Sequence, residues 1–140
     1  MKIQRVHIEN FRSIKELDFS PGQYCVLIGE NNSGKTNILR ALNLALGEMW
    51  PTERHFSEED FYNQEIGNDI VIQIYFDSTT EEWRNKHKIE IGGIELRCKA
   101  YKRAVKGKPA GTLKTDYYCI TSDGNQAQYP SEPFEKGQQF

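Results

Sequence analysis

The sequence has few cysteines and lacks long apolar runs, and these shortages exclude several classes of protein. Cys25, Cys98 and Cys119 are too few and too widely spaced for a disulfide framework or a metal knuckle. The longest apolar run, residues 24–28, has five residues, whereas a membrane-spanning helix needs roughly 20. No apolar stretch of signal-peptide length occurs at the N-terminus. We therefore expect no membrane association and a cytoplasmic location.

A strong net charge is also missing, because 18 Lys and Arg against 20 Asp and Glu leave a formal charge of −2. This balance excludes a uniformly basic protein, but the charges are segregated along the chain. Residues 53–69 contain six acids and one base, whereas residues 97–114 contain seven bases and no acid. Segregation of this kind can mark an interaction face, and it is also common in solvated hairpins.

Hydrophobic periodicity predicts strands and a helix in the first third of the chain. Alternation predicts half-buried strands at residues 2–10 and 14–19. Residues 24–28 are apolar without alternation, which is typical of a strand covered on both faces in a parallel sheet, with Cys25 as a small buried residue. Apolar positions at helical spacing over residues 38–46 predict a buried helix that Gly47 ends.

The rest of the chain predicts an antiparallel β subdomain over about residues 69–130. A long acidic connection, residues 47–68, precedes an alternating strand at 69–77 and a short helix at 79–87. Residues 88–103 predict a hairpin that turns at Gly92 and Gly93. A further strand is expected at 112–121, followed by a turn at 122–125.

The chemistry is concentrated between the predicted buried strand and the helix. Residues 29–36 fit the pattern G-x-x-x-x-G-K-[ST], which requires a strand before it and a helix after it. Glycines bring successive N–H groups to one anion, and the helix N-terminus adds its dipole. Lys35 would reach the outer phosphates as the catalytic residue, and the Thr36 hydroxyl would ligate Mg²⁺. We expect Mg²⁺ and ATP to be bound by Gly29, Glu30, Asn31, Asn32, Ser33, Gly34, Lys35, Thr36 and Asn37.

This motif and its surroundings resemble the N-terminal head of ABC-type ATPases of DNA maintenance, namely the RecF, RecN and SMC-like group and the OLD-family ATP-dependent endonucleases. Residues 8–14 (Ile-Glu-Asn-Phe-Arg-Ser-Ile) and 26–42 carry the resemblance, which is specific over residues 1–46. It is looser over residues 56–61 and the strand after them, and no family motif is found beyond about residue 85.

The resemblance implies an α/β P-loop NTPase fold: the first lobe of an ABC-type head, with the P-loop strand and helix at about residues 23–47. It also implies a nucleotide site completed across a head-to-head homodimer, with ATP as the clamp. Arg12 would lie beside the nucleotide and contact phosphate. The alternative for Arg12 is an ordinary surface arginine after a strand.

Several parts that ATP hydrolysis requires in this group are missing from the sequence. No Ser-Gly-Gly signature occurs, and no glutamine can be assigned as the sensor. The nearest candidate for the acidic strand is residues 70–77, where Ser78 stands in place of the catalytic glutamate after Asp77. The alternation there, with Gln73, instead favours a half-exposed antiparallel strand. We therefore expect a fragment of a longer protein, inactive alone, and we favour ATP over GTP because no guanine-reading motif is present.

Two functions remain open at this stage. One is the ATPase module of a DNA-processing protein such as an OLD-like endonuclease, and the other is a non-hydrolysing, ATP-dependent dimerisation or DNA-clamp module of RecF or SMC type. The basic hairpin could contact DNA, or it could be a solvated lysine-rich face. Its basic residues are Lys99, Lys102, Arg103, Lys106, Lys108 and Lys114.

Two further groups of residues are read as ordinary surface. We interpret His7, His55 and His87 as surface or capping residues. The adjacent acids Glu58, Glu59 and Asp60 are interpreted as solvated rather than metal-binding.

Overall fold

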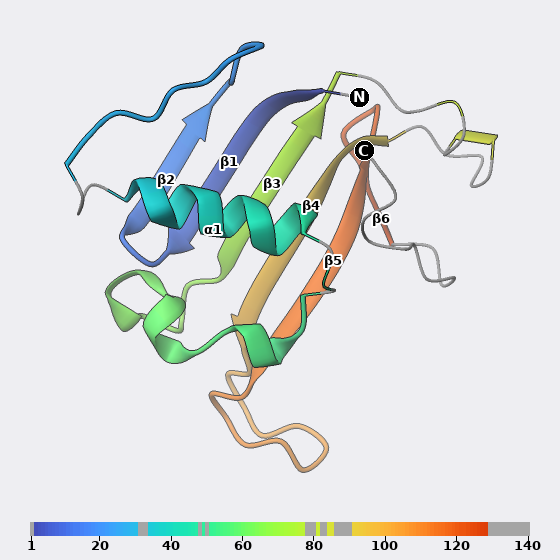
Figure 1. The fold of residues 1–140 in the computed structure, drawn as a ribbon. Coiled ribbons are helices and arrows are strands. Elements are labelled where there is room, and N and C mark those ends of the chain that lie inside the picture. The colour runs from blue at the N-terminus through green and yellow to red at the C-terminus, as the bar shows by residue number, and fades with distance from the viewer. Residues whose placement is uncertain are drawn as a thin grey trace.

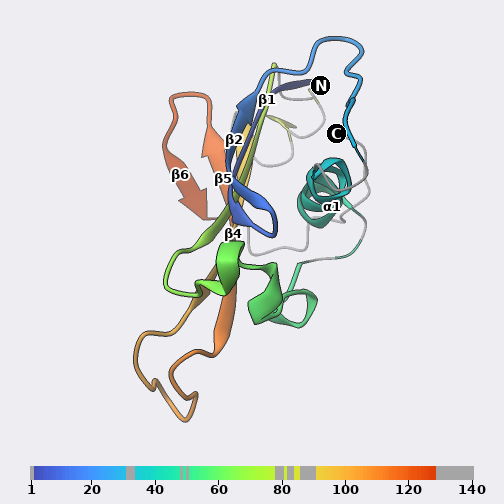
Figure 2. The same ribbon diagram turned by 90° about the vertical axis from the view of Figure 1, so that its left-hand side faces the viewer.

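The structure, a computed structural model, describes residues 2–30, 34–47, 49, 51–77, 81, 84–85 and 91–128. These residues form a six-stranded sheet in the order β2-β1-β3-β4-β5-β6, in which all neighbours are antiparallel. The strands are β1 (Ile3–Phe11), β2 (Ile14–Phe19), β3 (Ile70–Phe76), β4 (Ile91–Ala100), β5 (Leu113–Thr121) and β6 (Gln126–Gln128). Helix α1 (Lys35–Leu46) lies across one face of the sheet (Figures 1 and 2).

Three short 3-10 helices lie between α1 and β3 in the described part of the chain. They are η1 (Glu53–His55), η2 (Glu58–Asp60) and η3 (Tyr62–Gln64). Among the described residues, no helix has the length and apolar content needed to cross a membrane.

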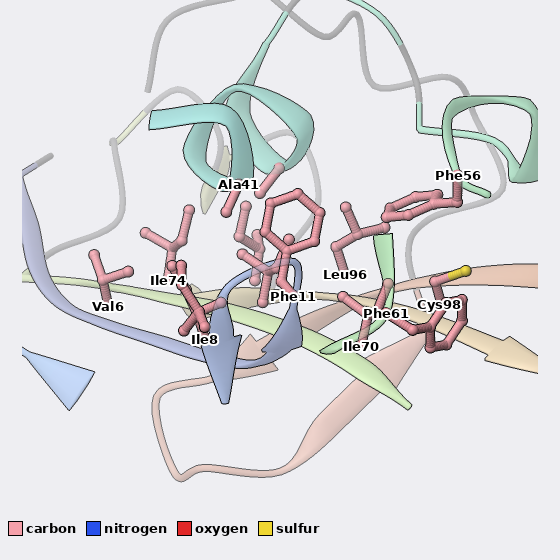
Figure 3. Packing of buried hydrophobic residues seen from close by; sticks show 14 of the residues in the cluster. Val6, Ile8, Phe11, Ala41, Phe56, Phe61, Ile70, Ile74, Leu96 and Cys98 are labelled. Atoms are coloured by element: carbon pink, nitrogen blue, oxygen red, sulfur yellow. The ribbon is translucent and has the colours of Figure 1, made fainter. Parts of the chain in front are cut away.

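The core lies between α1 and the sheet, and strand alternation explains which side chains fill it. Val6 and Ile8 of β1 lie opposite Ile74 and Ile72 of β3 in the strand register, so the four side chains share one face, and all four are buried. Figure 3 shows Val6, Ile8 and Ile74 in this core. Small Ala41 and Ala45 of α1 are also fully buried, which lets the helix approach the strands closely.

The C-terminal half of α1 is tied to the sheet by a hydrogen bond as well as by packing. The Tyr117 hydroxyl of β5 donates to the backbone oxygen of Ala45 at 2.7 Å. Burial raises the pKa of this phenol, so its proton stays in the hydrogen bond throughout the physiological range.

Most of the predicted elements are confirmed. The structure has strands where they were predicted, at residues 2–10, 14–19, 69–77 and 112–121, and a helix that Gly47 ends. Most of the predicted helix at 79–87 lies outside the described residues.

The predicted buried strand at residues 24–28 is wrong for this structure. The segment is irregular and leads from β2 to α1 (Figures 1 and 2), and Tyr24, Val26 and Ile28 are 87%, 78% and 89% exposed. Cys25, expected to be buried, is exposed as well. The physical reason is that the sheet is antiparallel throughout, so the described residues supply no parallel neighbour with which this run could pair.

The predicted hairpin turn at Gly92 and Gly93 is also wrong. Both glycines lie inside β4, where a Cβ on Gly93 would stand 2.5 Å from the backbone oxygen of Ile74. These glycines therefore permit a close backbone approach rather than a reversal. The hairpin is instead formed by β4 and β5, joined by residues 101–112.

The three cysteines provide a direct test of this arrangement. Burial raises the pKa of Cys98 and of Cys119 to about 12, so their reactive thiolate is scarce near neutral pH. We expect Cys25 to react rapidly with DTNB in the native chain and the other two thiols to react only after unfolding. A Cys25→Ser variant should lack the fast phase of the DTNB reaction, which would identify Cys25 as its source. Slow labelling of Cys25 in the native chain would contradict the exposed segment.

Candidate nucleotide-binding site

The N-terminus of α1 begins at a glycine whose backbone conformation suits an anion site. Gly34 has φ 95°, in the left-handed region that favours glycine, and a Cβ there would lie 3.0 Å from the Ser13 hydroxyl oxygen. Gly34 has no side chain with which to cap the helix, and the first turn of α1 contains no acid. The first N–H groups of the helix therefore remain available to a phosphate.

The motif residues that the structure describes gather around this helix start. Lys35 donates from Nζ to the backbone oxygen of Gly29, which joins the two ends of the glycine-containing turn. Thr36 is exposed, as a metal-binding hydroxyl must be. Asn37 donates from Nδ2 to the Ser13 hydroxyl oxygen at 2.8 Å. Of the other predicted residues, Glu30 is exposed, whereas Asn31, Asn32 and Ser33 lie outside the described residues.

The turn between β1 and β2 therefore adjoins the P-loop. Ser13 contacts α1 through Gly34 and Asn37, and Arg12 is the residue before it. Arg12 has φ 52° and its guanidinium donates from Nη2 to Asp60 Oδ1 at 2.8 Å. Its Nε is buried without a hydrogen-bond partner among the described residues. The structure thus brings Arg12 to the edge of the motif but pairs it with a carboxylate.

Asp60 corrects the interpretation of the acidic segment as simply solvated. Its side chain is only 8% exposed, whereas those of Glu58 and Glu59 lie in solvent. One carboxylate oxygen pairs with Arg12, and the other accepts from the Ser57 N–H at 2.8 Å, which caps η2. In addition, the Arg12 N–H donates to the Asp60 backbone oxygen at 2.7 Å.

Ser13 and Asp60 are thus site-shaping residues that the sequence interpretation did not assign. For Asp60 the available signal is the capping spacing of Ser57 to Asp60, flanked by two aromatic residues. Both aromatic residues, Phe56 and Phe61, are buried, and Phe61 forms a backbone bridge with Phe11. A cap flanked by apolar residues indicates a packed segment rather than a solvated one.

The candidate acidic strand is an antiparallel strand, as the preferred interpretation predicted, but the expected half-exposure is wrong, because five of the seven residues of β3 are buried. β3 lies between β1 and β4, with Gln73 opposite His7 and Glu95. Asp77 follows the end of β3, where its carboxylate accepts from the Lys2 N–H at 2.7 Å. This places Asp77 beside the start of β1.

The predicted basic hairpin divides into two groups. Lys99 and Lys114 face each other across β4 and β5, and each forms an ion pair with Asp116, at 3.3 Å and 3.4 Å. Four further bases are exposed on residues 101–112, a loop that extends beyond the end of the sheet (Figure 1); they are Lys102, Arg103, Lys106 and Lys108. Only the second group presents cations that have no carboxylate partner in the described part of the chain.

Comparison with known protein families identifies the family of this chain. The family profile of the AAA ATPase domain matches residues 1–133. The chain belongs to this AAA ATPase domain family. The resemblance to ABC-type heads of DNA maintenance, drawn from residues 8–14 and 26–42, is thereby confirmed.

Relatives of this AAA ATPase domain include a nuclease and proteins of DNA replication and repair. The OLD nuclease of Thermus scotoductus is 32% identical over 130 residues, covering 92% of this chain and 22% of the relative. The Rad50 ATPase of Thermococcus kodakarensis is 31% identical over 94 residues, covering 66% of this chain and 10% of the relative. The RecF protein of Chlorobium phaeobacteroides is 30% identical over 109 residues, covering 69% and 29%. The chain thus spans less than a third of each of these relatives.

Substitution of Asp60 tests its contact with Arg12. Asp60→Asn can keep the cap on Ser57 but loses the ion pair, and we expect it to lower the free energy of unfolding by about 1–3 kcal/mol. Asp60→Ala loses both contacts and should cost more. Urea unfolding measures these changes, with the exposed Glu59→Gln as control, expected within about 0.5 kcal/mol of the parent. An Asp60→Ala variant with the same free energy of unfolding as the parent would contradict a stabilising contact between Asp60 and Arg12.

Proposed function

We propose that this AAA ATPase domain binds Mg·ATP as part of a DNA-processing protein of the OLD nuclease type. The observation that carries the proposal is the G-x-x-x-x-G-K-T motif at the uncapped N-terminus of α1, with Arg12 and Ser13 beside it. The OLD nuclease relative, matched over 92% of the chain, supports the choice of protein class.

Each residue of the site has a distinct role in this proposal. The N–H groups at the start of α1 bind phosphate oxygens, and Lys35 exchanges its contact with the Gly29 carbonyl for the outer phosphates. Thr36 ligates Mg²⁺, whose charge offsets that of the triphosphate. Arg12 adds a second cation at the border of the site, held in place by Asp60.

Hydrolysis requires groups that this chain does not supply. Asp77 lies beside Lys2 and the sequence contains no Ser-Gly-Gly signature. We therefore propose that the isolated chain can bind ATP by itself. Hydrolysis would require further segments of a longer protein and a second head.

A second candidate is a non-hydrolysing, ATP-dependent dimerisation or DNA-clamp module of RecF type. The RecF relative of 30% identity favours it, although it covers 69% of the chain rather than 92%. In both candidates, ATP closes two heads and the exposed bases of residues 101–112 contact the DNA backbone. No helix in the described residues is placed to read bases, so this contact would be independent of sequence.

Replacement of Lys35 tests the nucleotide site. We expect Lys35→Ala to bind a fluorescent ATP analogue at least tenfold more weakly, because charge-assisted hydrogen bonds to phosphate are worth about 1.5–3 kcal/mol each. Circular dichroism should be unchanged, since Lys35 is not part of the core. Lys15→Ala, which removes an exposed lysine from β2, is the matched control. Undiminished binding by Lys35→Ala would remove the proposed site.

The DNA contact is testable by its dependence on salt in the full-length protein. Each phosphate neutralised on duplex DNA contributes about −0.9 to the slope of log affinity against log salt. Changing Lys102 and Arg103 together to Ala should flatten this slope by up to about two units and leave ATP binding unchanged. A variant with Lys15 and Arg40 changed to Ala removes the same charge from other exposed positions. If the parent and both double variants have equal slopes of log affinity against log salt, the loop at residues 101–112 does not contact DNA.

A further inference from the structure

The face of the sheet opposite α1 carries a histidine and carboxylates on the β1–β2 hairpin. Alternation turns Val6 and Ile8 into the core beneath α1 and His7 and Glu9 to the opposite side. The strand register then places Asp18 across from His7 and Glu16 across from Glu9. These four side chains share one small area, and the sheet separates them from the nucleotide site.

Three of these side chains converge closely enough to hold one cation. One donor atom from each of His7, Glu9 and Glu16 lies within 4.8 Å of the other two. His7 Nε2 is 2.7 Å from Glu9 Oε1, and the imidazole is largely covered, with 13% of its side chain exposed. A slight opening of this hydrogen bond gives the separation that ligands have around a shared ion.

The second nitrogen of His7 is already oriented from behind. His7 Nδ1 is 2.9 Å from Asp18 Oδ2. Arg5 holds the same Asp18 carboxylate through Nε, at 2.9 Å from Oδ1, and through Nη2. When an ion replaces Glu9 as the direct partner of Nε2, the Asp18 carboxylate would keep the proton on Nδ1, which is the usual outer-shell arrangement of metal-binding histidines.

Glu9 lies directly opposite Glu16 in the antiparallel pair, and a cation between them would stabilise this arrangement. Like charges directly opposite each other in an antiparallel pair destabilise a sheet. Arg5 is engaged by Asp18, and within the described residues Glu16 forms no ion pair of its own. His7 lies beside the Glu9–Glu16 pair in addition to its contact with Asp18, and a divalent ion would neutralise the two glutamates.

We propose that His7, Glu9 and Glu16 form a binding site for one divalent transition-metal ion, with Zn²⁺ as the best match. An imidazole nitrogen with two carboxylate oxygens is a donor set that Zn²⁺ accepts, whereas Mg²⁺ and Ca²⁺ prefer oxygen ligands alone. The ion would join β2, an edge strand, to β1. This site is separate from the Mg²⁺ expected at Thr36 and does not depend on the proposed nucleotide binding.

Calorimetric titration with ZnCl₂ tests the site on tag-free, EDTA-treated chain. The exposed Cys25 is first changed to Ser so that its thiol cannot contribute. We expect one Zn²⁺ per chain, with affinity at least tenfold lower in His7→Asn and unchanged in His55→Asn, a matched change of an exposed histidine. Affinity for Ca²⁺ should be far weaker. Equal binding by both histidine variants, or equal affinity for Ca²⁺ and Zn²⁺, would overturn the proposal.

The variant Glu16→Gln distinguishes a metal site from a purely structural role, because the two roles predict different changes in melting temperature without and with Zn²⁺. Without metal it relieves the repulsion with Glu9, so the melting temperature should stay the same or rise. With saturating Zn²⁺ the parent chain should gain stability, because the metal binds only the folded state, and the variant should gain much less. A Zn²⁺-induced rise in melting temperature of equal size in both proteins would place the metal elsewhere.

Discussion

The turn between β1 and β2 is held from two sides, and the geometry of the proposed nucleotide site depends on it. On one side, Asp60 binds both the backbone and the guanidinium of Arg12. On the other side, the Ser13 hydroxyl accepts from Asn37 and lies against Gly34. These contacts join three segments that are far apart in the sequence. Loosening the Asp60 contact would therefore disturb Arg12 and the start of α1 together.

The two faces of the sheet are built on different physical principles. The face under α1 is apolar, whereas the opposite face buries a complete carboxylate, Glu95, which is 0% exposed. Glu95 accepts from Gln73 at 2.6 Å, from Gln126 at 3.1 Å and from Arg97 at 3.0 Å. Removing any one donor would leave a buried charge poorly satisfied, which costs more than the contact itself contributes. This network therefore fixes the relative positions of β3, β4 and β6.

Local patterns were sufficient to predict most elements, because period and end signals act over a few residues. Alternation located β1 and β3, and the spacing of residues 38–46 with Gly47 located α1. Long-range features could not be obtained this way. The partner of Asp60 is Arg12, 48 residues earlier in the chain, and no local pattern encodes that pairing. Burial of residues 24–28 likewise depends on neighbouring strands rather than on the run itself.

The glycine pair in β4 shows a different limit of local patterns. Gly-Gly between apolar residues predicts a two-residue turn, yet Gly93 is required because Ile74 approaches its backbone. The same two residues thus serve opposite purposes, and only the register of β3 with β4 distinguishes them. In the glycine-containing motif before α1 the prediction is less ambiguous, because the lysine and hydroxyl after Gly34 add a chemical requirement to the conformational one.

The β1–β2 hairpin connects the two proposed sites, although they lie on opposite faces of the sheet. Its turn carries Arg12 and Ser13 against the nucleotide site, and its strands carry His7, Glu9 and Glu16 on the other side. Among the described strands, β2 lies at the edge of the sheet and pairs with β1 alone. An edge strand frays more easily than a central one. Cross-strand contacts such as Arg5 with Asp18 limit this fraying. Since the turn moves with its strands, a cation that joins Glu9 to Glu16 would also restrict Arg12 beside the phosphates.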